Sequence, residues 1–265
     1  MKNNLFDLRG KVAIVTGGNG GIGKGIADGL ASAGSDIVIF ARNKEKTAGA
    51  VSDIKKRFGV RALGLAVDVG QEASIKKGVK QVFDEFGQIN ILVNNAGVNI
   101  RRMPEEYTVE EWDWILGINL RGAFLCAKAV YPAMKKAGGG KIISIGSMTS
   151  LFGLAKVLCY ACSKAGIVQM TYTLALAWAK DNIQVNAILP GWIDTPLTVS
   201  ARRDFPGLDE FVLDRTPAGR WGVPADFAGA AVFLASKASD FVTAEYIKVD
   251  GGFGQGTNTM HPSAR

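Results

Sequence analysis

The chain has 265 residues, a length that suits one α/β domain with a large buried core. Hydrophobic residues make up 48% of the chain and charged residues 21%, which excludes general disorder. The net charge of +7 comes from scattered basic residues, a pattern typical of a solvated surface, so we expect no nucleic-acid partner.

Short β-rich runs alternate with longer helical patterns along the chain. Strands are expected at residues 12–15, 37–40, 62–67, 89–93, 141–145, 183–188 and 246–249, and helices at 22–33, 44–58, 72–86, 109–136, 160–180 and 224–235. This alternation predicts an α/β protein with one doubly wound Rossmann domain over residues 1–265, in which a parallel seven-stranded sheet carries helices on both faces. Residues 191–220 are expected to form a substrate lid, and residues 253–265 a mobile tail.

Neither a membrane segment nor a metal site is expected. No apolar run reaches the roughly 18 residues that span a bilayer, and the first ten residues lack the apolar core of a signal peptide, so a cytoplasmic location is predicted. Three cysteines, Cys126, Cys159 and Cys162, cannot build a disulfide framework. Cys159 and Cys162 form a C-x-x-C without a second ligand pair, and His261 is the only histidine, which argues against zinc.

A glycine-rich turn follows the first expected strand and precedes the first expected helix. Gly18, Gly20 and Gly23 fit the pattern G-x-G-x-x-G of dinucleotide-binding turns. Glycines allow the backbone to approach a pyrophosphate, and the helix N-terminus offers free N–H groups to it. A nucleotide-hydrolysing phosphate loop is the alternative, because Lys24 follows Gly23, but Gly25 stands where that loop needs a hydroxyl for magnesium.

Tyr160 and Lys164 form the candidate proton-transfer pair. They are four residues apart in a helical pattern and therefore share one helix face. A nearby ammonium favours the phenolate and lowers the pKa of the phenol from about 10. Such a pair can exchange a proton with an alcohol or ketone oxygen.

Several motifs occur in a fixed order around this pair. Residues 16–23 read T-G-x-x-x-G-I-G, residues 94–97 read N-N-A-G, Pro190-Gly191 follows a strand, and Ser147 stands thirteen residues before Tyr160. The set resembles the short-chain dehydrogenase/reductase family, over nearly the whole chain. The resemblance implies an oxidoreductase that interconverts a secondary alcohol and a ketone, in a homo-oligomer that is expected to be a tetramer.

The resemblance also implies roles for individual residues. Tyr160 would donate or accept the proton, and Lys164 would lower its pKa and hold the nicotinamide ribose. Ser147 would hydrogen-bond the substrate oxygen, and Asn119 would help to hold a water that relays protons past Lys164. The cofactor would contact Gly17, Asn19, Gly21, Ile22, Asp68 at its adenine, Asn95, Ala96, Gly97, Tyr160, Lys164, Pro190, Gly191, Ile193 and Thr195.

The end of the second strand favours NADP over NAD. An NAD site usually has an acid there, about 20 residues past the glycines. This chain has Ala41 and Arg42 instead, and a guanidinium can bind the 2′-phosphate of NADP. Asp36 lies at the other end of the strand and is not expected to reach the ribose.

Two further stretches point to the substrate. Ile100-Arg101-Arg102 and residues 214–222, with residues 147–150, resemble the gluconate 5-dehydrogenase and 2-deoxy-gluconate 3-dehydrogenase branch of the family. The resemblance implies a sugar acid or polyol as the substrate, and Arg101 or Arg102 could pair with a carboxylate. One alternative is a 3-oxoacyl-[acyl-carrier-protein] reductase or another keto reductase. A non-catalytic NADP-binding regulatory protein is a further alternative, although Tyr160 and Lys164 are both present.

Overall fold

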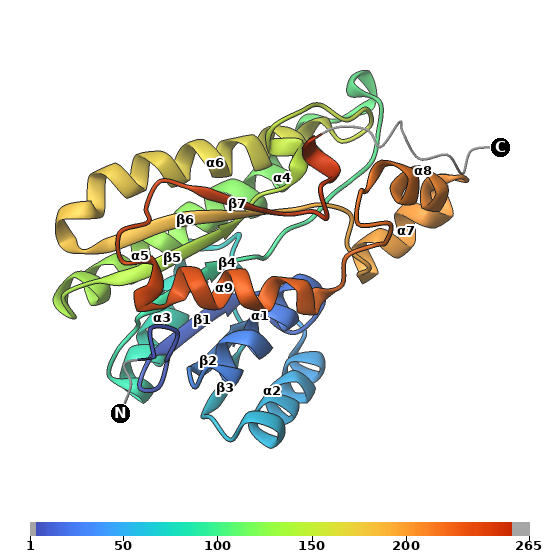
Figure 1. The fold of residues 1–265 in the computed structure, drawn as a ribbon. Coiled ribbons are helices and arrows are strands. Elements are labelled where there is room, and N and C mark those ends of the chain that lie inside the picture. Colours follow the sequence, from blue (N-terminus) through green and yellow to red (C-terminus); the bar gives the residue numbers. More distant parts are fainter. Residues whose placement is uncertain (1–3, 256–265) are drawn as a thin grey trace.

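A computed structural model describes residues 4–255, and its centre is a parallel seven-stranded sheet (Figure 1). The strands are β1 (Val12–Thr16), β2 (Asp36–Phe40), β3 (Ala62–Leu65), β4 (Ile91–Asn94), β5 (Gly140–Ile145), β6 (Ile183–Pro190) and β7 (Tyr246–Val249). They lie in the order β3-β2-β1-β4-β5-β6-β7, so the direction of winding reverses between β1 and β4. The predicted doubly wound sheet is confirmed, and a crevice is expected beyond the carboxyl ends at this reversal.

Helices cover both faces of the sheet (Figure 1). One face packs against α1 (Gly21–Ser32), α2 (Lys44–Phe58) and α9 (Ala228–Ala235), and the other against α3 (Glu72–Phe86), α5 (Gly122–Lys136) and α6 (Leu158–Trp178). Ala13 and Val15 belong to the first of the resulting cores, and Val12 and Ile14 to the second. Successive strand side chains point to opposite faces, and since both are buried, the strands are continuous apolar runs.

The single helix expected at residues 109–136 is interrupted. The structure has α4 (Val109–Leu116), a π-helical turn (Gly117–Arg121) and then α5. Glycines at both edges of the turn weaken the regular helix, and the side chain of Asn119 inside it bonds the backbone of Val98. The interruption therefore joins this helix to the segment that follows β4.

The segment expected to be a lid contains two helices beyond the carboxyl end of β6, at the right of Figure 1. They are α7 (Pro196–Asp204) and α8 (Leu208–Arg215). Thr195 precedes α7 and Pro196 opens it, which is a favourable helix start, and Gly207 before α8 has a φ of 83°. Opening and closing of this segment stays a prediction.

The end of the described chain is packed rather than free. Phe253 is only 4% exposed and packs with Met148 and Leu189 in a third, smaller core. The predicted mobile tail therefore does not begin at residue 253. Its remaining residues, 256–265, lie outside the described part of the chain.

Candidate active site

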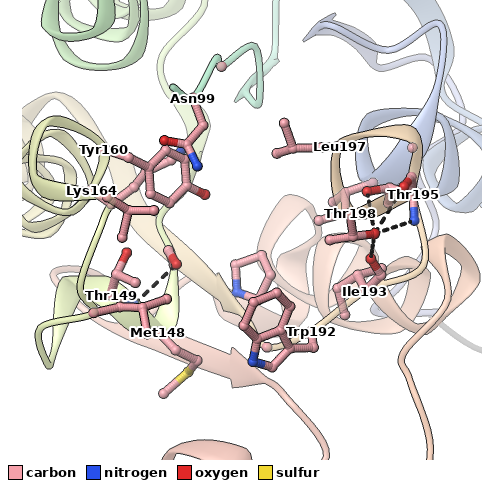
Figure 2. Close-up of a pocket in the computed structure, with 18 of the residues that line it drawn as sticks. Asn99, Met148, Thr149, Tyr160, Lys164, Trp192, Ile193, Thr195, Leu197 and Thr198 are labelled. Atoms are coloured by element: carbon pink, nitrogen blue, oxygen red, sulfur yellow. Dashed lines mark hydrogen bonds between the residues drawn. The ribbon is translucent and has the colours of Figure 1, made fainter. Parts of the chain in front are cut away.

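A cavity of about 910 Å³ lies beyond the carboxyl ends of the central strands and is bounded by α7 and α8. It brings together most of the residues that the sequence singled out. Those lining it are Gly17, Asn19, Gly21, Ile22, Asn95, Ala96, Gly97, Arg101, Ser147, Tyr160, Lys164, Pro190, Gly191, Ile193 and Thr195. Figure 2 shows Tyr160 and Lys164 on one side of this cavity and Thr195 and Leu197 on the other.

Four predicted residues do not line the cavity: Arg42, Asp68, Arg102 and Asn119. Arg42 is exposed after the end of β2. The Asp68 carboxylate accepts a hydrogen bond from the backbone N–H of Gly70 at 2.9 Å. Arg102 forms an ion pair with Glu111 at 2.8 Å, so its guanidinium is neutralised outside the site. This ion pair, outside the cavity lining, does not favour Arg102 as the residue that holds a substrate carboxylate.

Lys164 is almost completely buried, and one hydrogen bond fixes its position. Its side chain is only 4% exposed, and its Nζ donates to the backbone oxygen of Ile145 at 2.7 Å. Tyr160 lies one turn earlier on α6, with the centroid of its ring 5.5 Å from that Nζ. The helical spacing predicted for this pair is confirmed, and both side chains face the cavity.

Ser147 lies just past β5, in a loop that is tied to α6. Its Oγ accepts a hydrogen bond from the backbone N–H of Thr149 at 3.1 Å. The Ser147 backbone N–H donates to Ser150 Oγ at 3.2 Å, and Ser150 Oγ donates to the backbone oxygen of Lys164 at 2.7 Å. These contacts hold the Ser147 hydroxyl beside the helix that carries Tyr160 and Lys164.

Burial shifts the pKa of both residues of the pair. It raises the pKa of Tyr160, while a hydrogen bond with Ser147 and the charge of Arg101 act in the opposite direction. Burial also lowers the pKa of Lys164 to about 8. Both shifts have the same cause, since a low-polarity environment disfavours the charged form of each group. At neutral pH the tyrosine is therefore a phenol, the form that donates a proton.

Asn119 is buried behind the cavity and has a clear bonding role. Its Oδ1 accepts from the Val98 N–H at 2.8 Å, and its Nδ2 donates to the Val98 oxygen at 2.9 Å and to Ser163 Oγ at 3.0 Å. A Cβ on Gly97 would lie 3.3 Å from Asn119 Oδ1 and 3.7 Å from Lys164 Nζ. Asn119 thus holds the backbone after β4 against α6, and its part in a water relay stays a prediction.

The glycine-rich turn is closely packed against the segment after β4. Gly17 has a φ of 66°, and a Cβ there would lie 2.9 Å from Asn95 Nδ2, so no larger residue fits without displacement. Asn95 Nδ2 donates to the backbone oxygen of Thr16 at 2.9 Å. Lys24 pairs with Asp28 and Asp53 at 2.6 and 2.7 Å. A lysine engaged in this way does not support the phosphate-loop alternative.

Sequence reasoning missed several polar groups of this cavity. Lys46, in the first turn of α2, places its Nζ 2.5 Å from where a Cβ of Gly20 would stand. Asn99, Thr149 and Arg215 also line the cavity. The signal for Lys46 was its position, four residues after Arg42 and at the start of a helix that follows the cofactor strand. Thr149 and Arg215 lie in the stretches 147–150 and 214–222 that the sequence singled out, but neither was assigned a role of its own. Asn99 carried no such signal.

Known proteins are similar to this chain over almost its whole length. Residues 17–254 match the family described as enoyl-(acyl carrier protein) reductase. The chain is 43% identical to a 2-dehydro-3-deoxy-D-gluconate 5-dehydrogenase of Dickeya dadantii, with 94% of this chain and 98% of the relative covered. It is 36% identical to a gluconate 5-dehydrogenase of Gluconobacter oxydans, with 94% and 96% covered.

A solved structure of a gluconate 5-dehydrogenase from Burkholderia cenocepacia in complex with NADP and tartrate is 38% identical. It superposes with a TM-score of 0.89 over 94% of this chain and 97% of that one. The chain therefore belongs to the short-chain dehydrogenase/reductase family, as its motifs indicated. It is an oxidoreductase of that family, with Tyr160, Lys164 and Ser147 in one cavity.

The arrangement supports acid–base chemistry on one oxygen atom. The phenol of Tyr160 can donate a proton to a ketone oxygen, and the Ser147 hydroxyl can hydrogen-bond the same oxygen. The Lys164 ammonium, 5.5 Å from the centroid of the tyrosine ring, can stabilise the phenolate that remains. In the opposite direction, the phenolate accepts the proton of an alcohol.

The proton role of Tyr160 is tested by Tyr160→Phe, which removes only the hydroxyl. We expect kcat to fall by about a hundred- to ten-thousand-fold, the usual contribution of a general acid. Binding of NADPH, measured by fluorescence, should change less than about twofold, since the ring remains. A variant that retains more than about a tenth of the original kcat would show that another group donates the proton.

The lowered pKa of Lys164 predicts a pH dependence. Ketone reduction needs the ammonium, which is present below pH 8 and lost above it, so kcat/KM for the ketone should fall as the pH rises through about 8. In Lys164→Arg the charge does not titrate in this range, so the residual activity should lack this step. A step near pH 8 that persists in Lys164→Arg would assign it to another group.

Proposed function

We propose that the protein is an NADP(H)-dependent oxidoreductase that interconverts a secondary hydroxyl and a ketone of a sugar acid. The observation that carries this proposal is the composition of one cavity. Tyr160, Ser147 and Lys164 share it with the glycine-rich turn and with the cation Arg101. Relatives that align over almost the whole chain are named for gluconate and 2-dehydro-3-deoxygluconate.

The turn that begins at Gly17 fits a dinucleotide. The glycines leave a space beside the backbone that larger side chains would occupy. The N-terminus of α1, with its free N–H groups, follows directly. Asn19 is held there by a hydrogen bond from its Nδ2 to Thr47 Oγ1 at 3.0 Å. Gly17, Asn19, Gly21 and Ile22 would hold the pyrophosphate, Asn95 to Gly97 would line the cofactor, and Ile193 and Thr195 would hold the carboxamide. When bound, the nicotinamide supplies or accepts a hydride.

The cofactor end of the cavity favours NADP over NAD. Ala41 follows β2, so no carboxylate stands where it would repel a 2′-phosphate. Asp36 is held at the other end of that strand, where its Oδ1 accepts from the Arg61 N–H at 2.9 Å. Lys46 lies beside the turn and lines the cavity, whereas Arg42 is exposed outside the lining. Lys46 is therefore the first candidate to bind the 2′-phosphate, and Arg42 the second.

The choice between these two cations is tested by single alanine variants. Lys46→Ala should weaken binding of NADPH about tenfold, as expected for loss of a charge-assisted hydrogen bond. Binding of NADH should hardly change in either variant, because it has no 2′-phosphate. Arg42→Ala is the matched control, and its effect should be smaller. Dissociation constants from cofactor fluorescence decide the question, and a larger effect of Arg42→Ala on NADPH would reverse the assignment.

The substrate end of the cavity is positively charged. Arg101 lies in its wall, donating to Ser200 Oγ at 3.2 Å, and its charge reaches Tyr160. A positive wall attracts an acid and stabilises negative charge that develops on the oxygen being reduced. These features support a sugar acid rather than a neutral polyol.

A substrate panel tests the proposal directly. We expect 5-ketogluconate or 2-dehydro-3-deoxygluconate to be turned over with the higher kcat/KM, compared with an acetoacetyl thioester, and NADP(H) to be preferred over NAD(H). The thioester represents the alternative of a 3-oxoacyl-[acyl-carrier-protein] reductase. A preference for it would replace the sugar-acid assignment, and NADP(H) binding without turnover of any compound would favour a regulatory protein.

We also propose that the enzyme is a cytoplasmic homo-oligomer, with a tetramer as the expected form. Trp114, Phe124 and Leu176 expose large apolar side chains on α4, α5 and α6. A hollow that includes Phe124 is lined by apolar residues, namely Leu116, Leu120, Phe124, Met170 and Leu174, with Asp113, Arg121, Gln169 and Thr173 among the polar ones. Contiguous apolar surface of this kind is typical of subunit contacts.

The three cysteines are free thiols, as is usual in a reducing compartment, and no helix in residues 4–255 could cross a membrane.

A further inference from the structure

Three side chains in the cavity wall bury a polar atom that has no hydrogen-bond partner within residues 4–255. They are Asn99 through its Oδ1, Thr149 through its Oγ1 and Arg215 through its Nε. A buried polar atom without a partner carries a free-energy cost, and most such atoms in proteins are satisfied. Three of them around one cavity therefore point to groups that a ligand supplies.

Arg215 is the only one of the three that carries a charge, so a buried atom without a partner is most costly there. It ends α8, and its guanidinium carbon lies 4.8 Å from the ring centroid of Phe253 and 5.6 Å from that of Phe152. These rings remove water from the guanidinium but supply no counter-charge. Within the described chain no carboxylate lies within 4.0 Å of it. A cation in this environment favours an anion that can accept two parallel hydrogen bonds.

Three other cations of the cavity are hydrogen-bonded or lie away from the catalytic tyrosine. Arg101 donates to Ser200 Oγ at 3.2 Å and to the Leu197 oxygen at 3.5 Å, so its guanidinium is bound to α7. Lys164 donates to Ile145, and Lys46 lies beside the glycine-rich turn, away from the catalytic tyrosine. Lys156 also lines the cavity, but it is exposed and its Nζ lies 5.4 Å from the centroid of the Phe205 ring. Among these cations only Arg215 has a buried nitrogen without a hydrogen-bond partner in residues 4–255.

Asn99 and Thr149 lie close to the reacting position. In Figure 2, Asn99, Tyr160, Lys164 and Thr149 lie along one side of the cavity, with Asn99 above Tyr160 and Thr149 below Lys164. An amide oxygen accepts a hydrogen bond, whereas a threonine hydroxyl both donates and accepts. Groups of this kind are suited to hydroxyls on the carbons that flank a ketone.

We propose that Arg215 binds the carboxylate of the substrate and that Asn99 and Thr149 bind hydroxyls near the reacting carbon. The inference rests on the proposed sugar-acid activity. It assigns one residue to the carboxylate of that substrate and two residues to its hydroxyls. It moves the carboxylate contact from Arg101 or Arg102, the two candidates from the sequence, to the end of α8. A long acyl chain would leave all three polar atoms unpaired.

The carboxylate contact is tested by Arg215→Met and Arg215→Lys in the full chain. The substrates are 5-ketogluconate and its uncharged analogue with a hydroxymethyl group in place of the carboxylate. Arg215→Met should lower kcat/KM for the acid on the order of ten- to a hundred-fold, and for the analogue about twofold or less. Arg215→Lys keeps the charge without the paired donors, so its loss should be intermediate and again confined to the acid.

Two arginines serve as matched controls. Arg102→Met should leave both substrates unaffected, because Arg102 pairs with Glu111 outside the cavity. Equal losses on acid and analogue in both Arg215 variants would mean a structural role and overturn the proposal. An acid-specific loss in Arg101→Met with none in Arg215→Met would assign the carboxylate to Arg101. If the unmodified enzyme turns over neither compound, the sugar-acid function itself fails.

The hydroxyl contacts are tested with a substrate that lacks hydroxyls. Asn99→Ala and Thr149→Val should each lower kcat/KM for 5-ketogluconate about tenfold, because a substrate hydroxyl loses its partner. Neither should affect 4-oxopentanoate, a keto acid without hydroxyls, by more than about twofold. Parallel losses on the two keto acids would show that these residues shape the cavity and do not bind hydroxyls.

Discussion

The hydrogen bond from Lys164 Nζ to the Ile145 oxygen, 2.7 Å long, organises the active site. It joins α6 to the carboxyl end of β5, at the point where the chain turns toward Ser147. Tyr160 lies one helical turn before Lys164, so the same bond determines where the phenol lies. Ser150 adds a second tie by donating to the Lys164 backbone oxygen at 2.7 Å. The Tyr160 phenol, the Lys164 ammonium and the Ser147 hydroxyl are therefore positioned together.

This bond depends on a rigid environment, which the sheet provides. The strands are buried on both faces, and their parallel carboxyl ends bring the glycine-rich turn, the segment after β4 and the Ser147 loop to one edge. Burial there lowers the pKa of Lys164 to about 8 and raises that of Tyr160. Fold and chemistry are thus linked through the exclusion of water.

Periodicity predicted the strands, the sheet and the Tyr160–Lys164 pair, and the family resemblance added Ser147, because these depend on local patterns and on chain order. What they could not predict depends on distant contacts. The interruption at Asn119 arises from its bonds to Val98, and the burial of Phe253 from packing against Met148. Arg102 looked equivalent to Arg101 in sequence, yet Glu111, nine residues later, neutralises it. The position of Arg215 depends on how α8 folds over the cavity.

The most direct test of the account is to follow the transferred hydrogen. NADPH carrying deuterium at the transferable C4 position is incubated with 5-ketogluconate, and the product is analysed by mass spectrometry and NMR. We predict one non-exchangeable deuterium on the carbon that was the ketone, with the hydroxyl proton exchangeable with solvent. A product without carbon-bound deuterium, or cofactor left unoxidised, would contradict a direct hydride transfer in this cavity.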